Sequence, residues 1–244
     1  MRKLYKFLIA IGLIALVFYV LSVRPIPDKA DLKYGVSFSK FHSDELELDW
    51  RKTLLAILDD LKVRDLRFSA HWPMIEPEDG KFNFEELDYQ MNEARQRGAS
   101  VILAVGRRLP GWPECHEPDW LSQSTQEVQP QEPQEVEPLN KQERILRYVE
   151  AVVNRYKGYK NIKYWQVENE PFLAFFSRSL CGELDEKFLG REIELVKKLD
   201  PTRPVLLTSS GEFDPWFQAY KRADVFGSSM YLYIWWRTGP TRYP

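Results

Sequence analysis

The stretch Trp165-Gln166-Val167-Glu168-Asn169-Glu170-Pro171 decides the fold class and the functional hypothesis for this chain. Its first half reads as a short buried strand. The strand then runs into Asn-Glu-Pro, where proline has no N–H to donate to a sheet ladder. Partial burial at the mouth of a strand moves the pKa of a carboxyl group towards neutrality, which suits proton transfer. Glu170 is therefore a candidate general acid/base.

Strand-like and helix-like segments alternate on both sides of this stretch, which predicts a parallel β/α architecture. No glycine-rich phosphate fingerprint follows the first strand, which counts against a dinucleotide-binding fold. Unusual residues instead follow the carboxyl ends of the strands, the pattern of a (β/α)8 TIM barrel of which about six of eight units are present. The expected strands are 34–39, one within 63–72, 100–106, 162–169, 205–209 and 225–233, and the expected helices are 49–61, 84–97, 141–156, 185–199 and 215–220.

The ends of the domain are set by composition. Residues 1–6 are basic, and residues 7–23 are uncharged and near the minimum length for a bilayer span. We favour an uncleaved signal anchor over a cleaved signal, with a cytoplasmic N-terminus and an extracytoplasmic domain. Residues 24–33 form a linker to the barrel domain, 34–244. Within that domain, 122–140 is rich in Gln, Glu and Pro and is predicted to be a disordered insertion, as a solvated spacer rather than a substrate-gating lid.

Composition and missing motifs exclude several classes of function. The 244 residues are 44% hydrophobic with a net charge of −2, which gives no support for a nucleic-acid partner. No Walker motif or Gly-x-Ser-x-Gly elbow is present. The three histidines (His42, His71 and His116) are scattered without metal-ligand spacing. We therefore expect neither metal nor cofactor.

Strand-end Asn-Glu-Pro in the fourth strand resembles the acid/base signature of the retaining (β/α)8 glycosidases of clan GH-A, which include cellulases, β-mannanases and β-galactosidases. The resemblance covers about Tyr34 to Tyr233. It implies that Glu170 is the general acid/base and that Asn169 hydrogen-bonds the 2-hydroxyl of the sugar. Glu168 is the other nearby candidate for the acid/base, and we expect it to lie deeper in the barrel. The alternative is that Glu170 is a solvated loop residue with no catalytic role.

The same resemblance gives roles to charged and aromatic strand-end residues. Arg67 would orient the nucleophile glutamate, although a structural pair between Arg67 and Glu168 is the alternative. A tyrosine in the sixth strand would donate to that nucleophile, and alternation puts Tyr231 and Tyr233 on one face, with a slight preference for Tyr231. Aromatic and imidazole side chains at strand ends are candidates for sugar contact, with packing as the alternative: His71, Trp72, Trp112, Trp235 and Trp236.

Cys115 and Cys181 are the two cysteines of the chain. An even number in an exported domain permits a disulfide, and the barrel prediction puts both in loops at the same end. Two unpaired thiols are the alternative.

The main departure from the glycosidase pattern concerns the nucleophile. The family keeps it at the end of a seventh strand, so we expect it beyond residue 244. Glu212 is the in-chain candidate for a substitute, and we expect it to contact substrate instead. Three hypotheses follow: a C-terminally incomplete, membrane-anchored glycoside hydrolase acting on a poly- or oligosaccharide, which we favour; a barrel that binds glycan without hydrolysing it; and a surface interaction domain.

Overall fold

The computed structural model describes residues 2–22, 33–124, 140–173, 181–211, 216–231, 233–236 and 239–242. The chain divides into two compact units, Met1–Tyr34 and Gly35–Pro244. The first unit contains α1 (Arg2–Ser22), whose span Lys3–Val20 is long and apolar enough to cross a membrane. An apolar helix at this position fits a membrane anchor or a signal sequence.

The second unit is built on one parallel sheet of six strands, which curls as a half-barrel. Its order is that of the chain: β1 (Val36–Ser37), β2 (Asp65–Ser69), β3 (Ser100–Val105), β4 (Ile162–Val167), β5 (Val205–Ser210) and β6 (Val225–Ser229). Every strand lies beside its sequence neighbour, as in a (β/α)8 barrel. The predicted parallel β/α architecture is confirmed.

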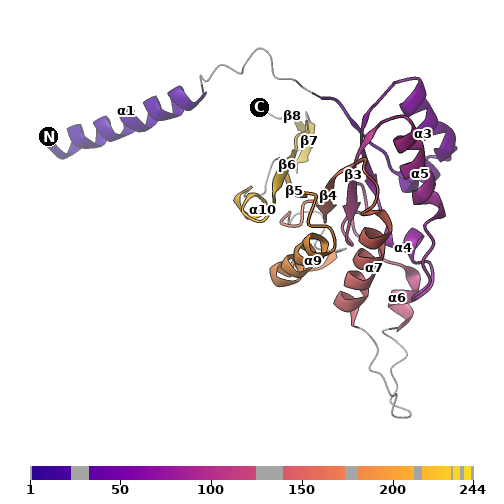
Figure 1. Cartoon of the computed structure of the whole chain (residues 1–244). Helices are drawn as coiled ribbons and strands as arrows, with labels where there is room; N and C mark the ends of the chain where they lie inside the picture. The colour runs from indigo at the N-terminus through magenta and orange to yellow at the C-terminus, as the bar shows by residue number, and fades with distance from the viewer. Residues whose placement is uncertain are drawn as a thin grey trace, which may run out of the picture. The chain divides into compact units, whose positions relative to one another are not determined.

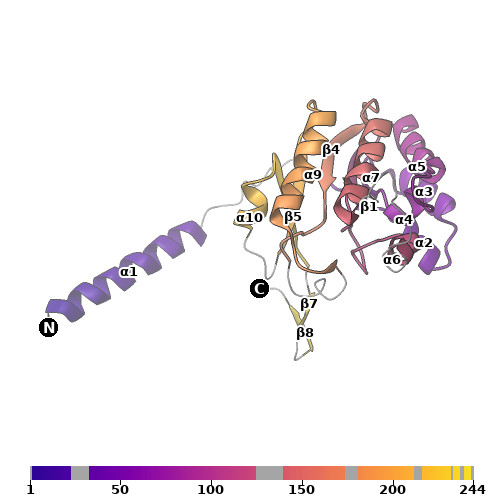
Figure 2. The ribbon, with the colours of Figure 1, turned by 90° about the horizontal axis from the view of Figure 1, so that it is seen from below.

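The longer helices cover one face of this sheet (Figures 1 and 2). These longer helices are α3 (Trp50–Asp59), α5 (Glu85–Gln96), α7 (Lys141–Tyr156) and α9 (Glu186–Leu199). Side chains cap the N-terminus of three of them: Asp49 caps α3, Asp185 caps α9, and Asn140 forms a capping box with Glu143 at α7. Among the residues described, the short helices are α2 (Lys40–Glu45), α4 (Trp72–Ile75), α6 (Asp119–Ser124) and α10 (Phe217–Tyr220).

Alternation along the strands separates the hydrophobic core from a polar inner face. Phe68, Leu103, Trp165 and Leu207 are fully buried in one cluster with apolar side chains of the helices. The intervening strand positions point to the opposite face of the sheet, towards the barrel axis. They include the polar residues Ser37, Arg67, Gln166 and Thr208.

The structure corrects two predicted boundaries. β6 ends at Ser229. This residue pairs with Ser210, the last residue of β5, so the pairing between the two strands stops there. Tyr233 instead begins β7 (Tyr233–Trp236), which pairs antiparallel with β8 (Gly239–Arg242), and the prediction that Tyr231 and Tyr233 share a strand face was wrong. The predicted insertion at 122–140 also overlaps the end of α6. Its residues 125–139, and Glu212, lie outside the described residues.

Cys115 and Cys181 form a disulfide, with Cα atoms 5.5 Å apart. The bond joins the loop after β3 to the segment that leads into α9.

Replacing both cysteines by serine should lower the free energy of unfolding by about 2–4 kcal/mol, because the unfolded chain loses a cross-link over a long loop. Urea unfolding of the full chain in mild detergent measures this difference. Peptide mapping without reduction provides the control, since the wild type should yield one linked Cys115–Cys181 peptide. Free thiols in that map, or an unchanged urea midpoint in the double variant, would contradict the expectation.

Candidate active site

The chain makes a sharp bend directly after β4. Glu168 has φ of 55° and Glu170 has φ of 45°. Both values lie in the left-handed region, which costs a non-glycine residue roughly 1–2 kcal/mol. Such strain persists only where the surroundings impose it. The bend sends Glu168 towards the helices, while Asn169 joins the polar inner face of the sheet.

The Glu168 carboxylate anchors the outer side of this bend. Its Oε1 accepts a hydrogen bond from the Arg107 N–H at 2.8 Å, and its Oε2 accepts one from the Arg108 N–H at 2.7 Å. Gly106, at φ of 109°, makes room, since a Cβ there would lie 2.5 Å from Glu168 Oε1. The expected place of Glu168 deeper in the barrel was wrong, because the left-handed backbone reverses the direction that strand alternation predicts.

A polar network fixes the inner side of the bend. Asn169 Oδ1 accepts hydrogen bonds from Gln166 Nε2 and from the Thr208 hydroxyl, both at 3.2 Å. The Glu170 N–H donates to Thr208 Oγ1 at 3.0 Å. Asn169 and Glu170 are only 6% and 5% exposed. This arrangement occupies the Asn169 carbonyl oxygen within the protein and leaves its Nδ2 group as the donor for a ligand.

Arg67 lies on the same inner face. It donates from Nε to Ser37 Oγ at 2.8 Å and from Nη1 to Gln166 Oε1 at 3.4 Å. Burial lowers the pKa of Arg67, and the charges of Tyr231 and Glu170 oppose that shift. The alternative pair between Arg67 and Glu168 is not formed in the described part of the chain. Arg67, Glu170 and Tyr231 therefore lie close enough to interact electrostatically.

The predicted aromatic contacts divide into exposed and buried residues. Trp112 and Tyr231 are 61% and 60% exposed, so each can present a face to a ligand. Trp72 is fully buried, stacks on Tyr148 and donates its indole N–H to Glu76. It is a core residue, and its prediction as a sugar contact was wrong. The side chains of Tyr233, Trp235 and Trp236 lie outside the described residues.

The three histidines meet around Phe41, although they are scattered in the sequence. The rings of His71 and His116 are 4.6 Å apart, and Phe41 lies within 6 Å of all three. Burial and the neighbouring histidines lower the pKa of His71 well below its usual value, and that of His116 to about 4. Loops after adjacent strands converge at one end of the sheet, which sequence spacing could not show. No group of metal-binding geometry occurs among the described residues.

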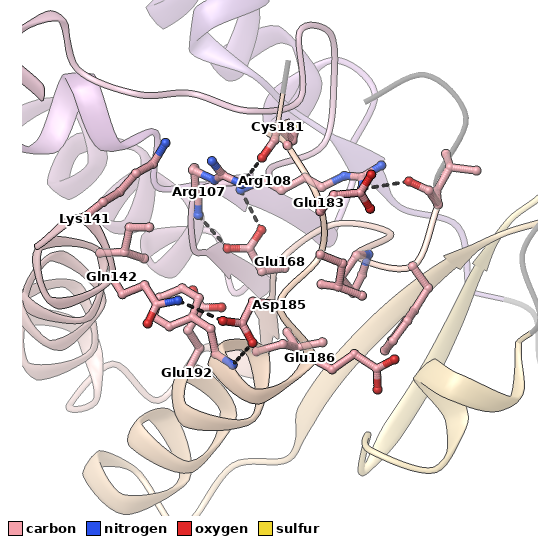
Figure 3. Close-up of a pocket in the computed structure, with 18 of the residues that line it drawn as sticks. Arg107, Arg108, Lys141, Gln142, Glu168, Cys181, Glu183, Asp185, Glu186 and Glu192 are labelled. Atoms are coloured by element: carbon pink, nitrogen blue, oxygen red, sulfur yellow. Dashed lines mark hydrogen bonds between the residues drawn. The ribbon is translucent and has the colours of Figure 1, made fainter. Parts of the chain in front are cut away.

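A cavity of about 470 Å³ lies on the helix side of the bend (Figure 3). Glu168 and Glu192 line it together with residues of the loop after β3 and the first turns of α7 and α9, whereas Asn169 and Glu170 do not. Burial, and then the charge of Glu168, raise the pKa of Glu192 well above its usual value. Burial also raises the pKa of Glu168, but the charge of Arg107 and the two backbone N–H groups oppose that shift. Glu192 is therefore the member of the pair that binds a proton more readily.

Glu192 was missed in the sequence analysis, although a signal was available. It lies on the apolar stripe of α9 formed by Leu189, Ile193 and Val196, where a buried carboxyl group needs a partner.

A comparison with protein families assigns the chain to a family. The family described as beta-galactosidase, glycoside hydrolase family 42, matches residues 52–200. The chain belongs to this family. The match includes Arg67, Glu168, Asn169 and Glu170, so the bend lies within the shared part of the sequence, whereas Thr208 lies outside it.

Individual relatives agree with this assignment. The chain is 31% identical over 140 residues to beta-galactosidase BgaB of Geobacillus sp. (strain Y412MC61), covering 53% of this chain and 20% of BgaB. It is 30% identical over 129 residues to beta-galactosidase Pbg of Clostridium perfringens, covering 50% of this chain and 18% of Pbg. The chain thus spans about a fifth of the length of these curated relatives.

Solved structures support the (β/α)8 barrel fold. The cold-adapted beta-galactosidase from Rahnella sp. R3 superposes with a TM-score of 0.58 at 14% identity, over 86% of this chain and 40% of that one. Xylanase 10B from Thermotoga petrophila RKU-1 superposes with a TM-score of 0.52 at 15% identity, over 82% of this chain and 59% of that one.

Replacing Glu192 by glutamine should change how stability depends on pH. A carboxyl group whose folded pKa is raised stabilises the fold below its unfolded pKa, about 4.3, and loses that contribution as pH rises. Glu192→Gln removes the titration, so its melting temperature relative to the wild type should increase between about pH 5 and pH 8. Thermal melts followed by circular dichroism measure this. Glu194→Gln, exposed on the same helix, is the control, and parallel curves for wild type and Glu192→Gln would rule out the raised pKa.

Proposed function

We propose that this chain carries the acid/base half of a retaining glycoside hydrolase site, with Glu170 as the general acid/base. The observation that carries the proposal is the bend after β4. It holds Glu170 and Asn169 nearly buried at the carboxyl end of a barrel strand, where active sites of this fold lie. Membership of a glycoside hydrolase family supports the class of reaction.

In the proposed reaction, Glu170 gives its proton to the glycosidic oxygen as the bond to the anomeric carbon breaks. A second carboxylate attacks that carbon and forms a glycosyl-enzyme. Glu170, now ionised, takes a proton from water, which hydrolyses the intermediate with net retention. We place the second carboxylate on a seventh parallel strand, next to β6 of the described sheet.

The residues around Glu170 receive matching roles. Asn169 Nδ2 would donate to the 2-hydroxyl of the sugar, a hydrogen bond that strengthens in the transition state. The guanidinium of Arg67 would orient the second carboxylate and keep it ionised, because a nearby cation favours the charged form. Tyr231 or Tyr233 would donate a hydrogen bond to the same group.

For the substrate we propose a β-galactoside, since the curated relatives are named beta-galactosidases. Trp112, exposed beside the strand ends, would stack on the sugar ring, with Trp235 and His71 as further contacts. We further propose that α1 anchors the protein in a membrane with the barrel domain outside the cytoplasm. The Cys115–Cys181 disulfide supports this, because such bonds persist in oxidising compartments.

Glu170→Gln should reduce hydrolysis of unactivated β-galactosides by about 10²–10⁴-fold, the usual contribution of general acid–base catalysis. Release of galactose from lactose, by a protein that continues through the expected seventh strand, measures this. The Glu194→Gln variant should keep wild-type turnover.

Equal turnover in Glu170→Gln and wild type would refute the assignment of Glu170. A wild type that binds a β-galactoside in isothermal titration without turnover would favour the glycan-binding barrel. Absence of both binding and turnover would favour the surface interaction domain.

A further inference from the structure

We propose that Thr208 is a positioning residue for both Asn169 and Glu170. This inference rests on the proposed function, because it assigns the group that holds the acid/base in place. Thr208 lies on β5, one strand away from the residues that it positions. It contacts no reacting atom itself.

The hydroxyl of Thr208 acts as a hydrogen-bond acceptor and as a donor at the same time. It accepts the Glu170 N–H at 3.0 Å and donates to Asn169 Oδ1 at 3.2 Å. A hydroxyl has one hydrogen to donate, so the second contact fixes its rotation and leaves its lone pairs facing the N–H. One side chain therefore holds the backbone of the acid/base and, together with Gln166, the amide of the residue beside it.

The backbone of Glu170 needs such a contact. Its φ of 45° is left-handed, and the residue that follows is proline. Without the hydroxyl, the Glu170 N–H would lose this hydrogen bond, and losing the partner of a buried donor costs about 1–3 kcal/mol. The chain can avoid that cost by leaving the left-handed region, and the carboxyl group would then move with it.

Thr208 is itself firmly placed. It is 6% exposed and pairs with Gly227 in the ladder between β5 and β6. A Cβ at Gly227 would lie 3.2 Å from Thr208 Cγ2, so the methyl group is closely packed. Packing of the methyl leaves the hydroxyl with one direction, towards the bend after β4.

The variants Thr208→Val and Thr208→Ser separate this role from general packing. Valine keeps the shape and removes the hydroxyl, whereas serine keeps the hydroxyl and removes the methyl. Thr53→Val is the matched control, because the Thr53 hydroxyl lies in the first turn of α3 and donates to the carbonyl of the N-cap residue Asp49. Thermal melts of all three variants report any loss of stability.

The first readout is kcat/KM for two aryl β-galactosides, measured in a protein that continues through the expected seventh strand. Phenyl β-galactoside has a poor leaving group that needs protonation by Glu170, and the 2,4-dinitrophenyl compound does not. We expect Thr208→Val to lose about 10–100-fold on the phenyl substrate, as a displaced catalytic group does, and less than about threefold on the other. Thr208→Ser should restore the phenyl activity. Equal losses on both substrates, or no loss on either, would overturn the proposal.

The second readout does not depend on activity. A crystal structure of Thr208→Val should show Glu170 outside the left-handed region and its carboxyl group displaced from the wild-type position. An unchanged bend would overturn the positioning role. If the wild type hydrolyses neither substrate, the proposed function fails, and this structural comparison alone decides the role of Thr208.

Discussion

The hydrogen bonds from the Arg107 and Arg108 N–H groups to Glu168 are the interaction on which the rest of the site depends. Two left-handed residues within three positions cost about 2–4 kcal/mol together. Hydrogen bonds to a charged acceptor contribute about 1.5–3 kcal/mol each. The two terms are of comparable size, so the carboxylate can hold the bend that a bare strand end would not adopt.

Backbone hydrogen bonds also join the segments that follow β3 and β4. The Glu168 N–H donates to the Val105 carbonyl, and the Asn169 N–H donates to the Arg108 carbonyl, at 2.9 and 2.8 Å. With the carboxylate bonds running in the reverse direction, the segments after β3 and β4 form one unit. The loop after β3 also carries Trp112 and Cys115, so the exposed indole and the disulfide are built on the same support.

Sequence patterns predicted the parts of the structure that depend on side-chain periodicity. The helix 141–156 is reproduced residue for residue by α7, and all six strands occur where apolar runs indicate them. Strand alternation accounts for the inward direction of Arg67 on β2 and of Gln166 on β4, and on β4 it holds up to Val167. It does not account for Asn169, which reaches the inner face through the bend. Alternation fails at Glu168, where the backbone changes sign of φ. Nothing in the residue types before a bend reports that change.

Other differences have equally local causes. Trp72 follows β2 as a ligand-binding residue would, but it opens α4 and turns into the core against Trp120 and Tyr148. Helical and extended continuations of a strand look alike in sequence when the residues are aromatic. Nothing in the sequence distinguishes Thr208 from other strand residues, because its hydrogen bonds to Asn169 and Glu170 depend on the bend after β4.

The carboxyl pair of Glu168 and Glu192 links the cavity on the helix side to the inner face of the sheet, because Glu168 also holds the bend that carries Glu170. Two carboxyl groups buried together cannot both ionise cheaply, so the proton goes to the one with fewer compensating donors. Glu168 has two backbone N–H groups and the charge of Arg107 nearby, whereas Glu192 has Glu168 as a like-charged neighbour. Acid that protonates Glu168 as well would turn one acceptor oxygen into a donor facing an N–H group. The bend would then lose half of its outer anchor, and Glu170 would be displaced through the backbone.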